Sequence, residues 1–256
     1  MGKIISITNQ KGGVGKTTTC VNLAAFIAKA GHKVLIIDMD PQGNASSAVG
    51  VEPTKDDYTI YEVLIGECSA KEATYNSVMP GLDVLPSTVD LSGAEVELVH
   101  LSNRENILKE ALAQAKKEYD YIFIDCPPSL SLLTVNALTA TDSIIIPIQC
   151  EYFALVGLGQ LMNTVKLIKK HLNPTIEIEG VLLTMKDARS NLVNQVAEEI
   201  QKYFKEKVYN TFIPRNIRLA ESPSHGQPIT MYDSKSKGAI AYQNLANEFL
   251  ASNKKN

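Results

Sequence analysis

The residues with the clearest chemical potential form a glycine-rich stretch near the N-terminus, in which three glycines precede a lysine and two threonines. These residues are Gly12, Gly13, Val14, Gly15, Lys16, Thr17 and Thr18. Glycines let a backbone approach a ligand closely, and the N–H groups of a helix N-terminus attract phosphate oxygens. This order of residues predicts a nucleotide-phosphate site, with Lys16 at the β- and γ-phosphates and the Thr17 hydroxyl on Mg²⁺.

The stretch departs from the usual phosphate-loop pattern at its start. The position that the pattern gives to its first glycine is Gln10, and a second lysine, Lys11, follows it. In this respect the stretch resembles the deviant Walker A motif of the ParA/MinD class of ATPases. The resemblance implies that Lys11 and Gly12 lie at a dimer interface, where Lys11 contacts the nucleotide phosphates of the partner subunit. The alternative is a tight strand-to-helix turn with solvated lysines.

Two aspartates, Asp38 and Asp40, stand two positions apart at the end of an apolar run, so their side chains are expected to point the same way. A carboxylate at this position can orient a water molecule for attack on a γ-phosphate. Residues 38–44 resemble the switch I motif of ParA proteins. The resemblance implies that Asp40 activates the water and that Asp38 supports the Mg²⁺ shell. The alternative is an Asp-Pro turn with a solvated acid.

A third aspartate, Asp125, closes the apolar run 121–124 in a Walker B pattern. The pattern predicts that Asp125 holds Mg²⁺, through a water molecule because Mg²⁺ keeps most of its hydration shell. Phosphoryl transfer depends on positioning and on neutralising charge, so Lys11, Lys16 and Asp40 are the expected catalytic groups. The alternative for Asp125 is a capped strand end.

In phosphate-loop folds the ends of the late strands flank the purine. Met185 and Pro214 are therefore expected to sandwich the base, and Asn216 to hydrogen-bond its edge. Adenine is the base that the family resemblance implies. The alternative for each of these three residues is ordinary loop packing.

Apolar runs and amphipathic segments alternate around these motifs. Strands are expected at residues 3–9, 33–38, 82–86, 121–125, 143–148, 178–184 and 208–213, and helices at 18–30, 102–117, 155–172 and 190–204. A capping box formed by Ser102 and Glu105 is expected to begin the second helix. Several runs are apolar throughout, which indicates burial on both faces of a parallel sheet. The alternation predicts a doubly wound α/β fold with helices on both faces of a mostly parallel sheet, and ligands at the carboxyl ends of its strands.

The composition is that of an ordinary globular protein. The chain has 256 residues and a net charge of −3, so any binding of nucleic acid must come from a local basic face. A linker, charge block or repeat that would divide the chain is not visible, so one domain over residues 1–256 is expected. The four cysteines lack disulfide or metal spacing, and neither a signal peptide nor a membrane-spanning run stands out, which favours a cytoplasmic location.

The motifs together resemble chromosomal ParA proteins of the Soj type. This resemblance extends along nearly the whole chain and includes the segment 213–226. It implies an ATPase with slow turnover that dimerises on ATP, binds double-stranded DNA of any sequence on the nucleoid, and is released when a ParB protein triggers hydrolysis. The cations expected at the DNA are Arg189, Arg218, Lys202, Lys205, Lys235 and Lys237, with Lys207 and Arg215 nearby; the alternative is an ordinary solvated surface.

Three other enzymes and a structural role remain as alternatives. A MinD-like membrane ATPase would need a basic amphipathic C-terminal helix, whereas the apolar stripe formed by Leu245, Phe249 and Leu250 is better explained by core packing. A nitrogenase-type iron protein would bridge a cluster with two cysteines of each subunit. A metabolic ATP-dependent synthetase would turn over without DNA. A structural protein would leave the lysines and aspartates unexplained, and we expect no membrane partner.

Overall fold

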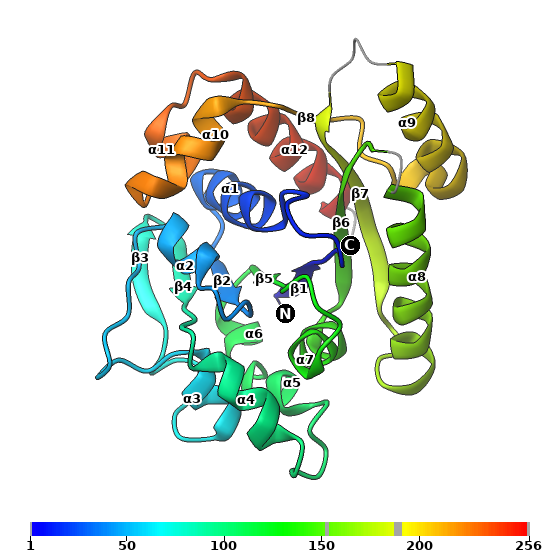
Figure 1. Cartoon of the computed structure of the whole chain (residues 1–256). Helices are drawn as coiled ribbons and strands as arrows, with labels where there is room; N and C mark the ends of the chain where they lie inside the picture. Colours follow the sequence, from blue (N-terminus) through cyan, green and yellow to red (C-terminus); the bar gives the residue numbers. More distant parts are fainter. Residues whose placement is uncertain (1, 152–153, 187–190, 255–256) are drawn as a thin grey trace.

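The computed structural model describes residues 2–151, 154–186 and 191–254, in which eight strands form one sheet (Figure 1). The strands are β1 (Lys3–Ile7), β2 (Val34–Asp38), β3 (Tyr75–Met79), β4 (Leu82–Leu85), β5 (Tyr121–Asp125), β6 (Ser143–Gln149), β7 (Glu177–Lys186) and β8 (Ile213–Pro214). Their order across the sheet is β3-β4-β2-β5-β1-β6-β7-β8. Only β3 runs antiparallel to its neighbour within this described part of the chain. The predicted doubly wound α/β fold is confirmed.

Helices cover both faces of the sheet. The first face carries α1 (Lys16–Lys29), α2 (Asn44–Ala48), α10 (Ile217–Glu221), α11 (Ile229–Tyr232) and α12 (Lys237–Asn253). The second carries α3 (Ile60–Ile65), α4 (Leu91–Leu98), α5 (Ile107–Ala111), α6 (Ala115–Glu118), α7 (Leu132–Ala140), α8 (Ala154–His171) and α9 (Asn191–Phe204). Two short 3₁₀ helices, η1 (Lys205–Lys207) and η2 (Ser222–His225), complete the order.

The continuous apolar runs are explained by the two cores that they feed. In β2, Val34 and Ile36 pack with α1 and α12, while Leu35 and Ile37 pack against the opposite helices. Successive side chains of a strand point to opposite faces, so a strand covered on both sides needs apolar residues at every position. All four of these side chains are fully buried.

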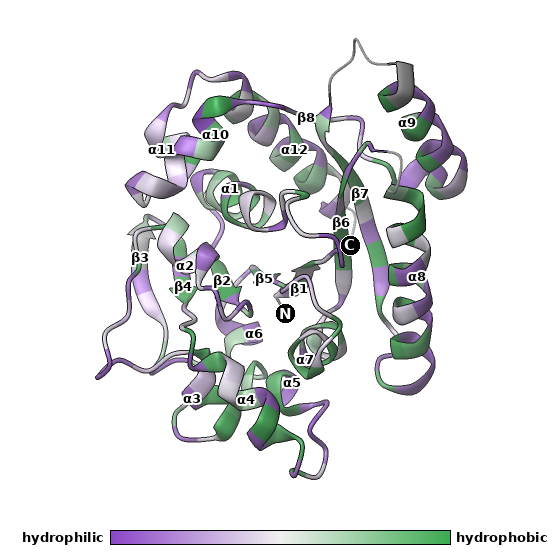
Figure 2. Ribbon diagram, in the orientation of Figure 1, coloured by the Kyte–Doolittle hydropathy of each residue, from purple (hydrophilic) through white to green (hydrophobic). Residues whose placement is uncertain are grey.

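The amphipathic helices are confirmed close to their expected bounds. α8 and α9 carry alternating apolar and polar bands in Figure 2. In the C-terminal helix α12, Leu245 and Phe249 are fully buried against the core that includes α1, so the stripe in the tail is core packing as expected. Within the described ranges, the structure contains no helix whose length and apolar character would suffice for a membrane span.

The expected single helix over residues 102–117 is wrong. The chain forms two short helices there, α5 and α6, and Ser102 and Glu105 lie in a turn before them. Asn103 has a left-handed backbone with φ of 64°, which interrupts a helix. The side chain of Asn136 on α7 accepts a hydrogen bond from Leu108 N (3.1 Å), so a tertiary contact replaces the predicted cap. A capping box does occur in α3, between Thr59 and Glu62.

The strand expected at residues 208–213 is also wrong. Only residues 213–214 form β8, and Val208 makes an isolated bridge to Val181. Between them, the carboxylate of Glu248 accepts hydrogen bonds from Asn210 N (2.7 Å) and Thr211 N (3.0 Å), so these N–H groups are not available to the sheet. The edge strand β3 was not expected from the sequence.

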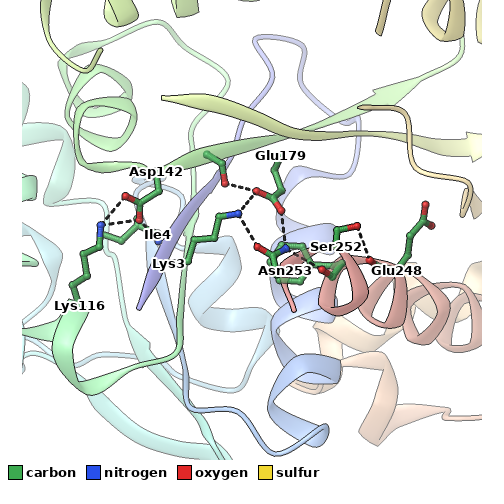
Figure 3. A network of polar contacts seen from close by, with 10 residues as sticks. Lys3, Ile4, Lys116, Asp142, Glu179, Glu248, Ser252 and Asn253 are labelled. Atoms are coloured by element: carbon green, nitrogen blue, oxygen red, sulfur yellow. Dashed lines mark hydrogen bonds and ion pairs between the residues drawn. The ribbon is translucent and has the colours of Figure 1, made fainter. Parts of the chain in front are cut away.

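A polar network joins the chain segments at the end of the sheet where the parallel strands begin (Figure 3). Lys3 Nζ contacts Glu179 Oε2 (2.5 Å) and Asn253 Oδ1 (2.7 Å), which joins β1, β7 and α12. Ser143 Oγ donates to Glu179 Oε2 (2.6 Å). The glycine-rich stretch and the aspartates Asp38, Asp40 and Asp125 all lie at or after the opposite ends of the strands, so this network stabilises the fold away from them.

Candidate active site

The glycine-rich loop lies between β1 and α1, and its backbone is shaped to face a ligand. Gly13 and Gly15 have φ of 72° and 88°, in the left-handed region that glycine adopts without cost. A Cβ atom added at Gly12 or Gly13 would meet no atom within 4 Å. Gly15 precedes α1 and supplies no side-chain cap, so the first N–H groups of that helix are available to an anion.

Two side chains that the sequence analysis missed hold this loop in place. Asn9 accepts a hydrogen bond from Lys11 N (3.0 Å) and donates from Nδ2 to Pro147 O of β6 (2.8 Å). On the other side, Thr184 Oγ1 of β7 donates to Val14 O (2.8 Å). The position of Asn9 directly after β1 was the only signal in the sequence, because its contact with Pro147 and the contact of Thr184 with Val14 join residues far apart in the chain.

The two lysines of the loop have different surroundings. Lys16 is 7% exposed, and its Nζ donates to Lys11 O (3.2 Å). Burial lowers the pKa of Lys16, and the neighbouring carboxylates of Asp125 and Asp40 oppose that shift. Lys11 points outward, where its Nζ pairs with Glu151 Oε2 (2.5 Å) at the end of β6. Its predicted role across a dimer interface stays a prediction.

Thr17 and Asp125, which are 108 positions apart in the sequence, meet at the start of α1. Thr17 Oγ1 donates to Asp125 Oδ2 (2.6 Å). Asp125 is fully buried, and its other oxygen, Oδ1, has no hydrogen-bond partner among the described residues. Burial and the nearby carboxylate of Asp38 raise the pKa of Asp125. A cation beside Oδ1 would relieve both effects.

The donor set fits Mg²⁺ only when phosphate oxygens are also present. In the described part of the chain, no group of three His, Cys, Asp or Glu side chains could hold a metal ion by itself. Mg²⁺ is commonly bound by one or two protein oxygens together with water and substrate phosphates. Thr17 and Asp125 supply such oxygens next to the glycine-rich loop.

Asp38 and Asp40 have separate surroundings despite their spacing. Asp38 pairs with Asp125 in the register of β2 and β5 and is fully buried. Its carboxylate accepts hydrogen bonds from Ser46 and Asp40, which oppose the effect of burial on its pKa; burial dominates and raises that pKa to about 6. Asp40 lines the cavity in front of the loop. The metal role of Asp38 stays a prediction.

A cavity of about 720 Å³ opens in front of these groups. It is lined by the glycine-rich loop, the start of α1, residues 40–42, 44, 47 and 48 around α2, residues 127–129 after β5, and Met185. Met185 has a φ of 50°, uncommon for a residue with a side chain, at the point where β7 leads into the cavity. Met185 therefore lies at the cavity, and its contact with a base stays a prediction.

The other two expected base contacts stay predictions, although Pro214 pairs with Lys186, next to Met185, in the register of β7 and β8. Pro214 and Asn216 are outside the lining of this cavity. Asn216 caps α10, because its Oδ1 accepts a hydrogen bond from Leu219 N (3.3 Å). Asn22, Ser222, Pro223 and Gln227, which the sequence analysis missed, form part of the wall. Asn22 lies on α1 and joins it to the first residue of α11, because Asn22 Oδ1 accepts a hydrogen bond from Ile229 N (2.7 Å).

The cations expected at DNA lie mainly around α9 and α10 to α12. Lys205, Lys207, Arg215, Lys235 and Lys237 are exposed. Lys202 pairs with Glu199 (2.6 Å), and Arg218 pairs with Glu221 (2.9 Å) and Asp233 (3.5 Å), so the positive charge of these two is partly neutralised. Arg189 lies outside the described residues.

Comparison with known proteins relates this geometry to a family. Residues 2–178 match a family model described as an AAA domain. The chain is 58% identical over 251 residues to the sporulation initiation inhibitor protein Soj of Bacillus subtilis, over 98% of this chain and 99% of that protein. It is 53% identical over 250 residues to the chromosome partitioning protein ParA of Myxococcus xanthus, over 98% and 88% of the two chains.

A solved structure shares the fold over the whole chain. Cobyrinic acid a,c-diamide synthase from Mycobacterium smegmatis, with bound ATP analogue and magnesium, superposes with a TM-score of 0.87. It is 35% identical to this chain and covers 100% of it, and the match spans 97% of the synthase chain. The same architecture therefore occurs in this synthase and in the chain described here. The chain is more similar in sequence to Soj and ParA than to the synthase.

Proposed function

Since this chain belongs to the ParA/Soj family of chromosome-partitioning ATPases, we propose that it is a slow Mg²⁺-dependent ATPase whose ATP-bound form is a DNA-binding homodimer. The observation that carries the proposal is the contact of Thr17 with Asp125 beside the buried Lys16. A buried ammonium group, a hydroxyl and a buried carboxylate oxygen without a partner are what a triphosphate with Mg²⁺ requires at its phosphate end.

ATP would bind with its phosphates on the glycine-rich loop and the first N–H groups of α1. Lys16 reaches the terminal phosphates from its buried position, and Thr17 and Asp125 hold the Mg²⁺. When bound, Mg²⁺ neutralises charge on the phosphate oxygens. Met185 lies at the mouth of the cavity and would contact the adenine. The ATP analogue and magnesium in the synthase relative support this ligand.

Hydrolysis would depend on Asp40, the aspartate that lines the cavity. Its carboxylate would orient a water molecule in line with the γ-phosphate. Lys16 and the glycine-rich loop stabilise the charge that develops on the transferred group. In one subunit Lys11 is turned away toward Glu151, so a single subunit would lack one positive charge and turn over slowly.

Dimerisation would supply that charge. Lys11 would exchange Glu151 for a phosphate oxygen of the partner subunit, and Gly12 would allow the two loops to approach closely. In the structure Gly12 faces open space, which supports a surface that accepts another chain. ATP would therefore hold the two subunits together.

The dimer would bind DNA through exposed cations of both subunits. Lys205, Lys235 and Lys237 are exposed, and Arg218 and Lys202 would exchange their acidic partners for phosphates. Each phosphate contact is weak and independent of sequence, so doubling the number of cations links DNA affinity to ATP. ParB would end the cycle by triggering hydrolysis and releasing the protein from the nucleoid.

The test is the oligomeric state and ATPase rate of the purified protein. Light scattering should show a monomer without nucleotide and a dimer with Mg²⁺ and a non-hydrolysable ATP analogue. The ATPase rate should be low and rise with DNA and the cognate ParB. A protein that stays monomeric with the saturating analogue, or that hydrolyses no ATP, contradicts the proposal.

DNA binding has its own test. Binding to duplexes of unrelated sequence should require ATP and weaken steeply as salt rises. The salt slope should decrease by about two when Lys235 is replaced by Ala, one for each subunit of the dimer. Equal binding without nucleotide would refute the link between ATP and DNA. If the monomer without nucleotide bound DNA as tightly as the ATP-bound protein, only the link between ATP and DNA would be refuted. The proposed ATPase activity would not be affected by that result.

A further inference from the structure

The loop that carries Asp40 is organised around a buried carboxylate. Asp38 Oδ1 accepts a hydrogen bond from Asp40 N (3.1 Å). Asp38 Oδ2 accepts two more from Ser46 at the start of α2, one from the backbone N (2.8 Å) and one from the hydroxyl Oγ (2.8 Å). Asp38 is fully buried and Ser46 is 1% exposed. Both oxygens of Asp38 are therefore held by the chain that follows it.

The Ser46 hydroxyl has a second bond that fastens the loop to the neighbouring strand. Ser46 Oγ accepts a hydrogen bond from Ser87 N (3.1 Å), just after β4. Ser87 is 3% exposed, so water cannot readily replace that bond. The same hydroxyl thus donates to Asp38 and accepts from Ser87, which fixes its orientation.

We propose that Ser46 is a positioning residue for ATP hydrolysis, which holds Asp40 at the cavity through Asp38. Ser46 fixes the Asp38 carboxylate, and Asp38 fixes the backbone of Asp40. The side chain of Asp40 is oriented in turn because its Oδ1 accepts a hydrogen bond from Gln42 N (3.0 Å). The inference rests on the proposed ATPase function and assigns Ser46 a part in it.

The effect should fall on hydrolysis and not on nucleotide binding. The groups that hold the phosphates lie on the glycine-rich loop and α1, and this loop is anchored separately by Asn9 and Thr184. Loss of the Ser46 hydroxyl leaves those anchors intact. It removes one donor from Asp38 and leaves Ser87 N buried without its acceptor, so the loop can shift relative to the cavity.

A matched substitution separates positioning from general stability. Ser143 is 3% exposed, and its hydroxyl donates to the carboxylate of Glu179 (2.6 Å), as that of Ser46 donates to Asp38. Ser143 is the first residue of β6, at the end of the sheet away from the site. Its partner Glu179 belongs to the network of Figure 3. Ser46→Ala and Ser143→Ala therefore each remove a buried hydroxyl from a carboxylate, which is fully buried in Asp38 and partly buried in Glu179. Only the Asp38 carboxylate contacts the loop that carries Asp40.

The experiment measures kcat and KM for ATP, the Kd of a fluorescent ATP analogue, and the Tm of the full-length wild type and both variants. Both variants should have a lower Tm. Ser46→Ala should lower kcat by about tenfold to a hundredfold, as expected for a displaced catalytic group, with KM and Kd unchanged. Ser143→Ala should keep the wild-type kcat. Equal kcat for the two variants, or a loss of nucleotide binding in Ser46→Ala, overturns the inference.

A second substitution protects the test if Ser46→Ala fails to fold. Asp38→Asn keeps the shape of the side chain. Where the Nδ2 group of the asparagine faces Asp40 N, two hydrogen-bond donors meet and the bond is lost. This substitution should also lower kcat, and an Asp38→Asn protein with the wild-type kcat overturns the inference. Where Ser46→Ala folds, the double variant should be no slower than the slower single variant. Additive losses would show independent roles and overturn the inference. A wild type without ATPase activity would instead refute the proposed function.

Discussion

At the scale of single residues, the side chains of the two loop lysines differ in their exposure to solvent. Lys16 is buried among carboxylates, and Lys11 forms an exposed pair with Glu151. A buried ammonium group gains most from an anion, because it has already lost its hydration. An exposed pair contributes little and is easily exchanged. Lys16 therefore suits a permanent phosphate contact, while Lys11 suits a contact that forms and breaks.

The exchange of Lys11 predicts the effect of removing its partner. Glu151→Gln should lower the protein concentration needed for ATP-dependent dimerisation by up to about thirtyfold, because dimerisation breaks one pair in each subunit and an exposed ion pair contributes up to about 1 kcal/mol. Light scattering across a dilution series with the ATP analogue measures this. The control is Glu199→Gln, which removes the exposed pair with Lys202. Dimerisation at the wild-type concentration in Glu151→Gln would show that the pair does not restrain Lys11.

At the scale of elements, close backbone contacts hold the walls of the cavity together. Gly50, which follows α2, has φ of 79°, and a Cβ added there would lie 2.9 Å from Gly226 O, which follows η2. α2 and η2 both contribute residues to the cavity lining. Two glycines thus allow two short helices to meet where side chains would keep them apart.

Replacing one of these glycines tests the contact. Gly66 already has a left-handed backbone, with φ of 83°, and a Cβ added there would meet no atom within 4 Å. Gly66→Ala should therefore lower the free energy of unfolding only by the cost of a side chain in this conformation, about 1–2 kcal/mol. Gly50→Ala adds a clash with the Gly226 backbone and should cost more. Chemical denaturation of both variants gives the two free energies of unfolding. Equal losses would mean that the helices separate without penalty.

The environment of Glu179, at the end of the sheet away from the site, predicts that the stability of the protein depends on pH. Burial alone would raise the pKa of Glu179, but hydrogen bonds from Lys3, Ser143 and Asn253 outweigh burial and leave the pKa lowered. A carboxyl with a lowered pKa in the folded state stabilises the protein above its unfolded pKa, and this stability is lost as pH falls. Glu179→Gln should therefore lower the Tm clearly at pH 7, with the difference from wild type shrinking below about pH 4.5. A constant difference between pH 4 and pH 7 would contradict this.

At the scale of the whole molecule, the groups of the site are gathered at one edge of the sheet. The ends of β1, β2, β5 and β7 bring the glycine-rich loop, the loop of Asp40, Asp125 and Met185 to one cavity. Ligands of doubly wound folds bind at this edge because the loops after parallel strands converge there. The exposed side of the glycine-rich loop then becomes the surface on which a second copy would dock.

That docking surface can be blocked without disturbing the monomer. Gly12→Val adds a side chain to open space within one chain, so the variant should fold and bind nucleotide normally. The same side chain would prevent the close approach of two loops, and the variant should stay monomeric with ATP. Light scattering and nucleotide titration are measured together. A Gly12→Val protein that still dimerises with ATP would place the interface elsewhere.

Local patterns in the sequence were sufficient for most of the elements and for the positions of the candidate site residues at their ends. The phosphate-loop residues, the aspartates at the ends of β2 and β5, and the parallel sheet followed from the order of glycines, charges and apolar runs. These features depend on neighbours within one strand, turn or helix, so a short stretch contains the information. Identity with relatives then fixed the family.

Contacts between distant segments were decided only by the tertiary structure. Asn136 replaces a predicted helix cap, Asn216 caps a helix, and Glu248 takes the hydrogen bonds of an expected strand. Ser46 and Thr184 gained roles that no motif indicates. A polar side chain bonds to whichever group the folded chain brings within about 3 Å, and the sequence alone does not specify which distant group that is.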